Sequence, residues 1–195
     1  LFGDYVSQDD KNSEVMAYKF DQGGLGMPSR DYYFKTDART EKIRGAFKEY
    51  LLKTFQQLGN DDATAQKNAD AVYALETKLA KASRKLEDLR DPYKNYNKMN
   101  VEQLSKLALG INWNTFTKNI GISKRDSVIV GQPECYSELN HEITSTNINV
   151  WKNYLQFHLI QSLSGNLDSF RFTYEFPYAE YLSGASGPRP GRKTR

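Results

Sequence analysis

The sequence predicts a mainly α-helical fold: a multi-helix domain with a long antiparallel helix hairpin and a short N-terminal β-hairpin. In two long stretches of the first half of the chain, apolar residues recur every three or four positions. That spacing places them on one face of a helix. Residues 1–20 instead alternate with a period of two around the polar turn Asp9–Ser13, which is the pattern of two paired strands.

A glycine-rich segment follows the predicted β-hairpin. Gly23, Gly24 and Gly26 allow backbone angles that a Cβ would forbid, and Pro28 fixes one φ angle. We expect a rigid corner in which Gly26 has a positive φ and Ser29 caps a short helical turn. The segment lacks the Gly-Lys-Ser/Thr ending of a phosphate-binding loop. It therefore predicts a structural turn, or alternatively a loop that shapes a substrate cavity.

The helix hairpin is predicted from residues of about 40–58 and 62–89. The apolar positions of its first helix are Ile43, Phe47, Tyr50, Leu51, Phe55 and Leu58. Those of its second helix are Val72, Leu75, Leu79, Ala82, Leu86 and Leu89. Gly59 stands where a C-cap belongs, and Asp91-Pro92 is expected to end the second helix. Because only Gly59 and Asn60 separate the two helices, we expect them to be antiparallel neighbours.

Shorter elements are predicted between residues 100 and 130. Asn100 can cap a helix, with Gln103 at the capping-box position. A second short helix around Trp113 is expected to stop at Gly121. Residues 127–130, which are Ser-Val-Ile-Val, predict a brief extended segment.

The last third of the chain predicts further helices. One helix is expected to begin at Pro133, and the next, over residues 148–163, to be capped by Thr146. The residues from 167 to 176 fit both a strand and a helix. We favour a helix there, which bends or ends at Pro177.

Composition limits the organisation and the partners of the chain. Residues 1–182 are expected to form a single helical domain, and residues 183–195 a mobile basic tail. The net charge of +3 arises from four basic residues in that tail, since the rest of the chain has 23 of the 27 basic residues against 24 acidic ones. We therefore expect no nucleic-acid surface. No apolar run approaches the ~20 residues of a membrane span.

The candidate catalytic residues form no complete site. His141-Glu142-Ile143-Thr144-Ser145 resembles a zinc-binding helix, but Ser145 stands where the second histidine is needed. The other histidine, His158, lies on the apolar stripe of its predicted helix. A catalytic zinc ion typically has three protein ligands. We therefore predict no catalytic, cofactor-binding or metal-binding residue in this chain.

Two other groups of reactive residues favour a structural role. Cys135 is the single cysteine, and it could form a dyad with His141 only if tertiary folding brought them together. The carboxylates that follow the predicted hairpin are expected to form a solvated helix end. The expected pairs join Glu87, Asp88 and Asp91 to Arg84 and Arg90.

Several motifs, in their order along the chain, carry a family resemblance. They are Asp9–Ser13, Leu25–Tyr33, Leu75-Glu76, Arg90-Asp91-Pro92 and Tyr96–Met99. Together they resemble the non-catalytic helical part of the neprilysin family of zinc endopeptidases. The similarity runs from Leu1 to Gly184, whereas the basic end departs from the family pattern.

The resemblance implies two mainly helical lobes that face each other across a closed cavity. One lobe binds zinc through a His-Glu-x-x-His helix and a downstream glutamate, and zinc-bound water cuts the peptide bond. The other lobe is a lid that admits only short peptides. This chain resembles the lid, so zinc is expected in the intact enzyme and not in this chain. The implied partners are the catalytic zinc lobe of the same polypeptide and short peptide substrates.

The same resemblance predicts a secreted, periplasmic or envelope-associated bacterial protein, and a fragment that is inactive alone. Two alternatives stay open at this point. The chain could be a stand-alone helical peptide- or ligand-binding module that shares only the architecture. It could also be an independent hydrolase that uses His141 and Glu142, which would require the chain to bind zinc.

Overall fold

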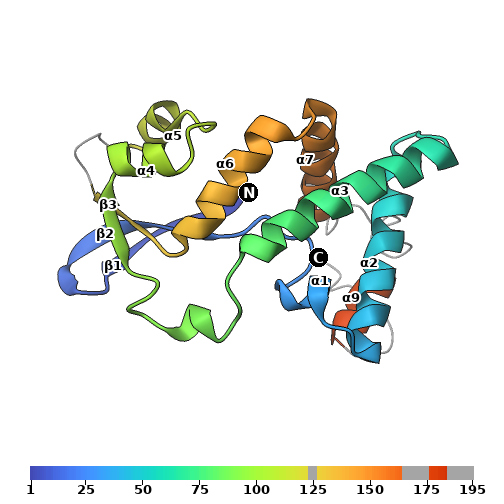
Figure 1. The fold of residues 1–195 in the computed structure, drawn as a ribbon, viewed down its shortest axis with the longest axis horizontal. Coiled ribbons are helices and arrows are strands. Elements are labelled where there is room, and N and C mark those ends of the chain that lie inside the picture. Colours follow the sequence, from blue (N-terminus) through green and yellow to red (C-terminus); the bar gives the residue numbers. More distant parts are fainter. Residues whose placement is uncertain (123–126, 164–175, 184–195) are drawn as a thin grey trace, which may run out of the picture. The chain divides into compact units, whose positions relative to one another are not determined.

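The computed structural model describes residues 1–122, 127–163 and 176–183 (Figure 1). Most of these residues are helical, as the sequence predicts. The chain divides into two compact units. Unit 1 consists of Leu1–Arg30 and Glu76–Thr146, and unit 2 consists of Asp31–Leu75 and the chain from Asn147 onward. The division falls within helix α3, Asp62–Ala82, which therefore contributes residues to both units.

Unit 1 contains a four-stranded sheet with the order β1-β2-β4-β3. Strands β1 (Phe2–Asp9) and β2 (Asn12–Gln22) form the predicted N-terminal β-hairpin. Strand β4 (Ser127–Val130) pairs parallel to β2, with Val130 opposite Phe20, and β3 (Asn97–Asn100) pairs antiparallel to β4. The hairpin is therefore part of a larger sheet, because the apolar segment 127–130 joins a strand more than a hundred residues earlier.

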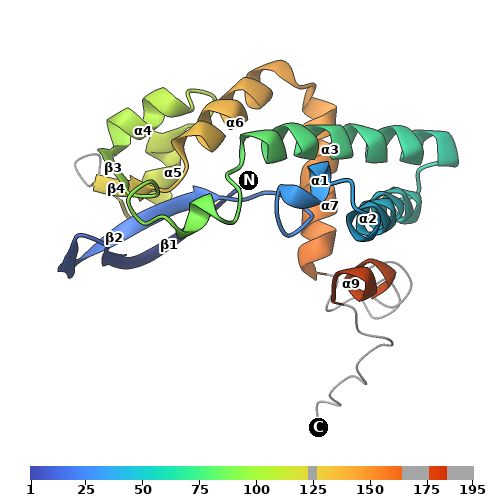
Figure 2. The same ribbon diagram turned by 60° about the horizontal axis from the view of Figure 1, so that its bottom comes forward.

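Three helices cover one face of this sheet, as Figure 2 shows. They are α4 (Val101–Leu107), α5 (Trp113–Asn119) and α6 (Pro133–Ser145). The buried core between helices and sheet consists of Phe20, Val101, Leu104, Ala108, Trp113, Val128, Val130 and Tyr136. The indole N–H of Trp113 donates to the Ala108 carbonyl at 2.9 Å, so its one polar group is satisfied inside the core.

Local signals place several helix ends where the sequence predicts them. Asn100 and Gln103 form a reciprocal capping box at the start of α4, with bonds of 2.8 and 2.9 Å. Gly59 and Gly121 follow α2 and α5 with φ of +86° and +79°, a left-handed conformation that glycine adopts without steric cost. Pro133 is the first residue of α6.

Unit 2 contains α1 (Asp31–Phe34), α2 (Ala38–Gln57), α7 (Ile148–Leu163), α9 (Phe176–Ser183) and the first part of α3. The predicted helix hairpin is present, since α3 follows α2 after residues 58–61.

An aromatic cluster packs α2 against α7 and α9. The ring of Phe47 lies 5.8 Å from that of Phe157 and 5.3 Å from that of Tyr178, between centroids. Tyr50 contacts the same two rings at 5.3 and 5.9 Å. These contacts bury one face of α2 within unit 2.

The second hairpin helix is shorter than predicted: α3 ends at Ala82 and not near residue 89. Leu86, assigned to the apolar stripe, is 53% exposed. The Ser83 hydroxyl donates to the Leu79 carbonyl at 3.0 Å, and the Arg84 amide donates to the Gln22 side chain at 2.7 Å. A tertiary contact thus takes the amide that would otherwise continue the helix.

Three further details differ from the predictions. The Ser29 hydroxyl caps no turn, because it is buried and makes no hydrogen bond within the described residues, and α1 begins at Asp31. Thr146 is the C-cap of α6, while the Asn147 side chain accepts from the Asn149 amide at the start of α7. Pro177 is the second residue of α9, where its missing N–H costs no hydrogen bond. The predictions for residues 167–175 and 184–195 lie outside the described residues.

Candidate functional site

The zinc-like motif of α6 is used for packing. Glu142 is 1% exposed, lies 3.0 Å from the Lys78 Nζ of α3, and accepts a hydrogen bond from the Thr146 hydroxyl. Burial favours a higher pKa for Glu142, but the hydrogen bonds from Thr146 and Lys78 outweigh it and hold that pKa below its ordinary value. This carboxylate therefore anchors α6 to α3 in its ionised form.

The remaining residues of the motif do not converge on a metal position. The side chain of His141 is largely exposed, with its Nε2 4.0 Å from the nearer Glu142 oxygen. The hydroxyl of Ser145, at the position of the missing second histidine, donates to the His141 carbonyl at 2.8 Å. Among the residues that the structure describes, no three His, Cys, Asp or Glu side chains form a group that could hold a metal ion.

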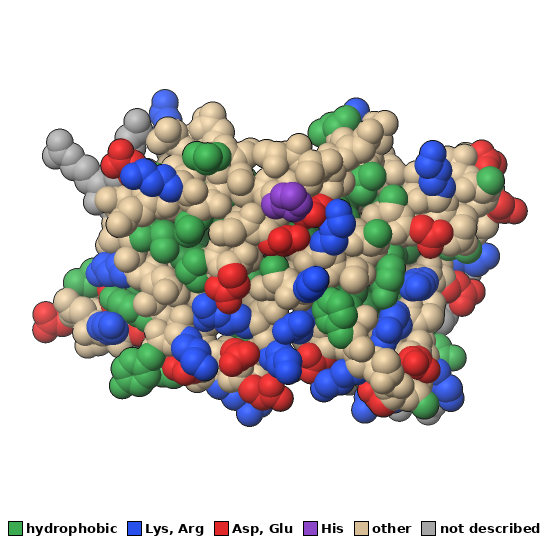
Figure 3. Space-filling view, in the orientation of Figure 1, with side chains coloured by type: hydrophobic (Ala, Val, Ile, Leu, Met, Phe, Trp, Pro, Cys, Tyr) green, Lys and Arg blue, Asp and Glu red, His purple; other side chains and the backbone are tan. Residues whose placement is uncertain are grey.

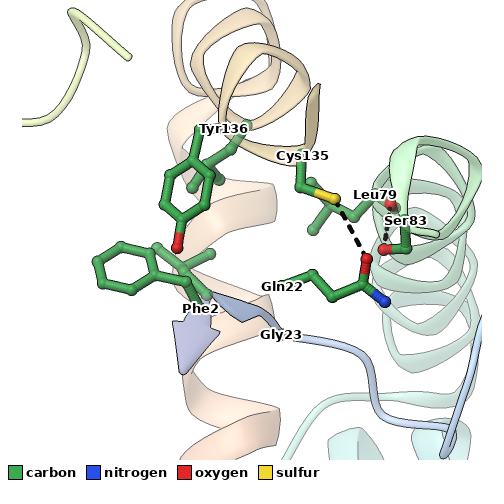
Figure 4. Close-up of a pocket in the computed structure, with 9 residues that line it drawn as sticks. Phe2, Gln22, Gly23, Leu79, Ser83, Cys135 and Tyr136 are labelled. Carbon is green, nitrogen blue, oxygen red and sulfur yellow. Dashed lines mark hydrogen bonds between the residues drawn. The ribbon is translucent and has the colours of Figure 1, made fainter. Parts of the chain in front are cut away.

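Cys135 lies beside a small cavity in unit 1 (Figure 4). Its thiol donates to the Ala82 carbonyl at 3.2 Å and lies 3.5 Å from the Gln22 side-chain oxygen. Burial raises the pKa of the Cys135 thiol to about 11, which opposes a role as a nucleophile. The cavity volume of about 10 Å³ is too small for a substrate.

The glycine-rich corner is fixed by a buried carboxylate. Glu76 is fully buried and accepts a hydrogen bond from the Gly26 amide at 3.1 Å. The positive φ, +79°, belongs to Gly24 and not to Gly26 as predicted. The chain turns earlier because β2 pairs with β1 as far as Gln22, so it must leave the sheet immediately afterwards. The corner is therefore structural, and Glu76 is the residue that holds it.

A polar network joins the end of β2 to the segment after α3. The Gln22 side chain accepts from the Arg84 amide at 2.7 Å and donates to the Arg84 carbonyl at 3.1 Å. The Arg84 guanidinium binds both carboxylate oxygens of Glu134. It also donates to the side-chain oxygen of Asn95 at 3.0 Å and to the Gly131 carbonyl at 3.1 Å. Arg84 thus pairs with Glu134 in α6, and not with the carboxylates near residue 90 as predicted.

A second cluster brings two of the family motifs, Asp9–Ser13 and Tyr96–Met99, into contact. Asp9, at the hairpin turn, accepts from Lys98 Nζ at 2.7 Å, the Tyr96 hydroxyl at 2.9 Å and the Lys11 amide at 2.9 Å. The Lys98 hydrogen bond, followed by that of the Lys11 amide, lowers the pKa of Asp9 to about 2. The turn motif and the Tyr96–Met99 motif are therefore two halves of one ion-pair cluster.

A polar hollow of about 460 Å³ lies on the sheet face opposite the core. It is lined by Tyr5, Asp10, Lys19, Asp21, Gln22, Leu89, Arg90, Pro92, Asn95, Ile129 and Gln132. Most of its charged groups are already paired: Lys19 lies 2.7 Å from Asp10, and the Tyr5 hydroxyl donates to Asp21 at 2.8 Å. Because these side chains bind one another, they do not point together toward a bound substrate.

The surface drawn in Figure 3 carries interspersed acidic and basic side chains. Such mixing generates no extended field of one sign on that face. Within the described parts of the chain, no helix is both long enough and apolar enough to span a bilayer.

A comparison with known protein families shows which family the chain belongs to. Residues 1–195 match the model of the N-terminal domain of peptidase family M13. The chain belongs to peptidase family M13.

Curated relatives in this family are much longer than the chain. An endothelin-converting enzyme homologue of Locusta migratoria is 32% identical over 204 aligned residues, which cover 98% of this chain and 28% of the locust protein. Human endothelin-converting enzyme 1 is 32% identical over 174 residues, covering 86% of the chain and 22% of the enzyme. The chain thus spans about a quarter of the length of these relatives.

Solved structures agree with the M13 assignment. Zinc metalloprotease Zmp1 of Mycobacterium tuberculosis in its open state superimposes with a TM-score of 0.88 and 27% identity, over 97% of this chain and 30% of Zmp1. PepO of Lactobacillus rhamnosis HN001 gives a TM-score of 0.79 at 18% identity over 94% of the chain and 29% of PepO, which shows the shared fold.

The M13 motifs of this chain are thus explained by packing. Glu76, Asp9 and Lys98 each occupy a structural position in unit 1. The sequence did not indicate the roles of Gln22 and Gln132, whose side chain accepts from the Gln22 amide at 2.7 Å. Amide side chains follow no periodic pattern, and these partners lie 110 residues apart. Glutamines near strand ends, such as Gln22 and Gln132, become informative only once the pairing of the strands is known.

Proposed function

We propose that this chain is the non-catalytic helical lobe of a zinc-dependent endopeptidase. In the intact protein it covers the active-site cavity and restricts substrates to short peptides. The match of the whole chain to the N-terminal domain of family M13 carries the proposal. The 27% identity with a zinc metalloprotease, at a TM-score of 0.88, supports it.

The chemistry of the chain is consistent with a supporting role. The buried acidic groups Asp9, Glu76 and Glu142 are each engaged by a lysine or a backbone amide of unit 1. Carboxylates that are bound in this way hold elements together and are not poised to transfer protons. Zinc and the water that it activates would be supplied by the other lobe of the polypeptide.

An open state has been described for Zmp1 itself, and so have a partially open state and an inhibitor complex. We infer that the lobe formed by this chain also moves relative to the catalytic lobe. Opening would admit a peptide, and closure would exclude water and larger chains from the site.

Peptidase assays on the intact protein test this function. We expect one zinc ion per intact polypeptide and cleavage of short fluorogenic peptides, with kcat/KM falling steeply as a folded protein replaces the peptide. The isolated chain should retain no stoichiometric zinc, and His141→Ala should leave the zinc content of the intact protein unchanged. Equal cleavage of short peptides and folded proteins would refute the size restriction. An intact protein without zinc or peptidase activity would favour a ligand-binding module instead.

A further inference from the structure

Helix α7 of unit 2 is apolar on two faces. One face is buried within unit 2 through Trp151, Tyr154 and Phe157, which are at most 7% exposed. The opposite face carries Ile148, Leu155, Leu159 and Leu163, which are 65%, 54%, 59% and 46% exposed. Helix α7 also carries polar residues, among them Lys152 and Gln156, and an apolar stripe on such a helix normally faces a packed surface. We therefore expect the second face to be covered by a partner.

The exposed residues of α7 form a continuous ridge. Leu155, Leu159 and Leu163 follow one another at a spacing of four, and Ile148 lies seven positions before Leu155. At 1.5 Å per residue, the ridge extends for about 22 Å along the helix. Single exposed leucines are common on protein surfaces, whereas a row of this length marks an interaction site.

The chemistry of the ridge favours a second helix as its occupant. Residues spaced by four form the ridge that packs into the grooves of another helix. Helix α7 has no acidic residue, and Lys152 is the basic residue that accompanies the ridge. A helix with an apolar stripe and an acidic residue near the Lys152 end would complement it.

We propose that the ridge Ile148–Leu163 is the docking site for an amphipathic helix of the same polypeptide, from the part outside these 195 residues. This inference rests on the proposed function, in which the chain is one lobe of a longer peptidase. The curated relatives support that source, because about three quarters of their length lies outside the matched region. The ridge thereby ties this lobe to the rest of the enzyme.

Hydroxyl-radical footprinting of the intact wild-type protein tests the proposal without any substitution. We expect Leu155 and Leu159 to be oxidised roughly tenfold more slowly than in the denatured protein, as for a site that reacts only on opening. Phe157, on the buried face of the same helix, reports whether α7 is folded. If Phe157 is protected while Leu155 and Leu159 react as fast as in the denatured protein, the ridge is uncovered and the proposal is wrong.

A photo-cross-linking residue at position 159 of the intact protein identifies the occupant. A cross-link within one polypeptide, to a segment outside these 195 residues, supports the proposal. A product of doubled mass would identify a second copy of the chain and overturn it. Zinc content and peptidase activity of the same preparation test the proposed function separately. A zinc-free, inactive protein with a protected ridge would refute that function and leave the docking surface intact.

Discussion

Replacing Gln22 by methionine tests whether a tertiary contact ends helix α3. The side-chain amide of Gln22 makes two hydrogen bonds to the backbone of Arg84. It accepts from the Arg84 amide and donates to the Arg84 carbonyl. Methionine has nearly the same length and flexibility but can make neither bond. The amide and carbonyl of Arg84 would then lose their partners in a half-buried position.

The expected destabilisation follows from those two bonds. A neutral hydrogen bond contributes about 0.5–1.5 kcal/mol net, so Gln22→Met should lower the free energy of unfolding by about 1–3 kcal/mol. With a urea slope of about 2 kcal/mol/M, the midpoint of unfolding should fall by roughly 1 M. Gln8→Met is the matched control, because Gln8 is exposed in β1 of the same hairpin. It should leave the midpoint unchanged.

Amide hydrogen exchange at Arg84 gives a local measurement of the same contact. The Arg84 amide should exchange faster in Gln22→Met than in the wild type, while amides in the centre of α3 keep their protection. An unchanged urea midpoint together with an unchanged Arg84 exchange rate would show that Gln22 does not hold this segment. The end of α3 would then need a different explanation.

Three further predictions concern single residues. Gly24→Ala should destabilise the protein by about 1 kcal/mol, because Gly24 has φ +79°; by contrast, Gly45→Ala within α2, where an added Cβ meets no atom, should stabilise it by about 0.5–1 kcal/mol. The two urea midpoints should therefore shift in opposite directions. The pKa of Asp9 is lowered from 3.8 to about 2, so its stabilising effect should be complete above about pH 4 and lost as the pH falls toward 2. Asp9→Asn should flatten that part of the stability–pH curve, and a curve of wild-type shape would contradict the role of Lys98. The pKa of the Cys135 thiol is raised from 9.0 to about 11. At pH 8 its thiolate fraction should therefore be about a hundredfold lower than that of an exposed cysteine. Alkylation as fast as that of an exposed cysteine would disprove this.

At the candidate site, the sequence shows which residues are present, and the tertiary structure shows which of them are already bound to other groups. The incomplete zinc motif is visible in the sequence, since Ser145 stands in place of a histidine, and a missing ligand needs no tertiary information. The role of Glu142 is not visible there, because its partner Lys78 lies 64 residues away. The same is true of Asp9, whose partner Lys98 is 89 residues away. A sequence shows which groups are present but not which of them are consumed by packing.

The sequence by itself determined the elements whose causes are local. The capping box of Asn100 and Gln103, the left-handed Gly59 and Gly121, and Pro133 at the start of α6 each depend on residues within one helical turn. Their geometry follows from backbone sterics and from hydrogen bonds between near neighbours, so it can be predicted without knowledge of the rest of the fold.

At other positions a segment from far along the chain binds the backbone groups, and there only the tertiary structure decided the outcome. Helix α3 ends at Ala82, and the Arg84 amide that would continue it binds instead to Gln22, 62 residues before Arg84. The left-handed glycine is Gly24 because pairing fixes β2 as far as Gln22. Segment 127–130 is extended as the sequence predicts, but its place between β2 and β3 is known only from the strand pairing. In each case the local sequence allows more than one conformation, and the group that arrives from far along the chain satisfies only one of them.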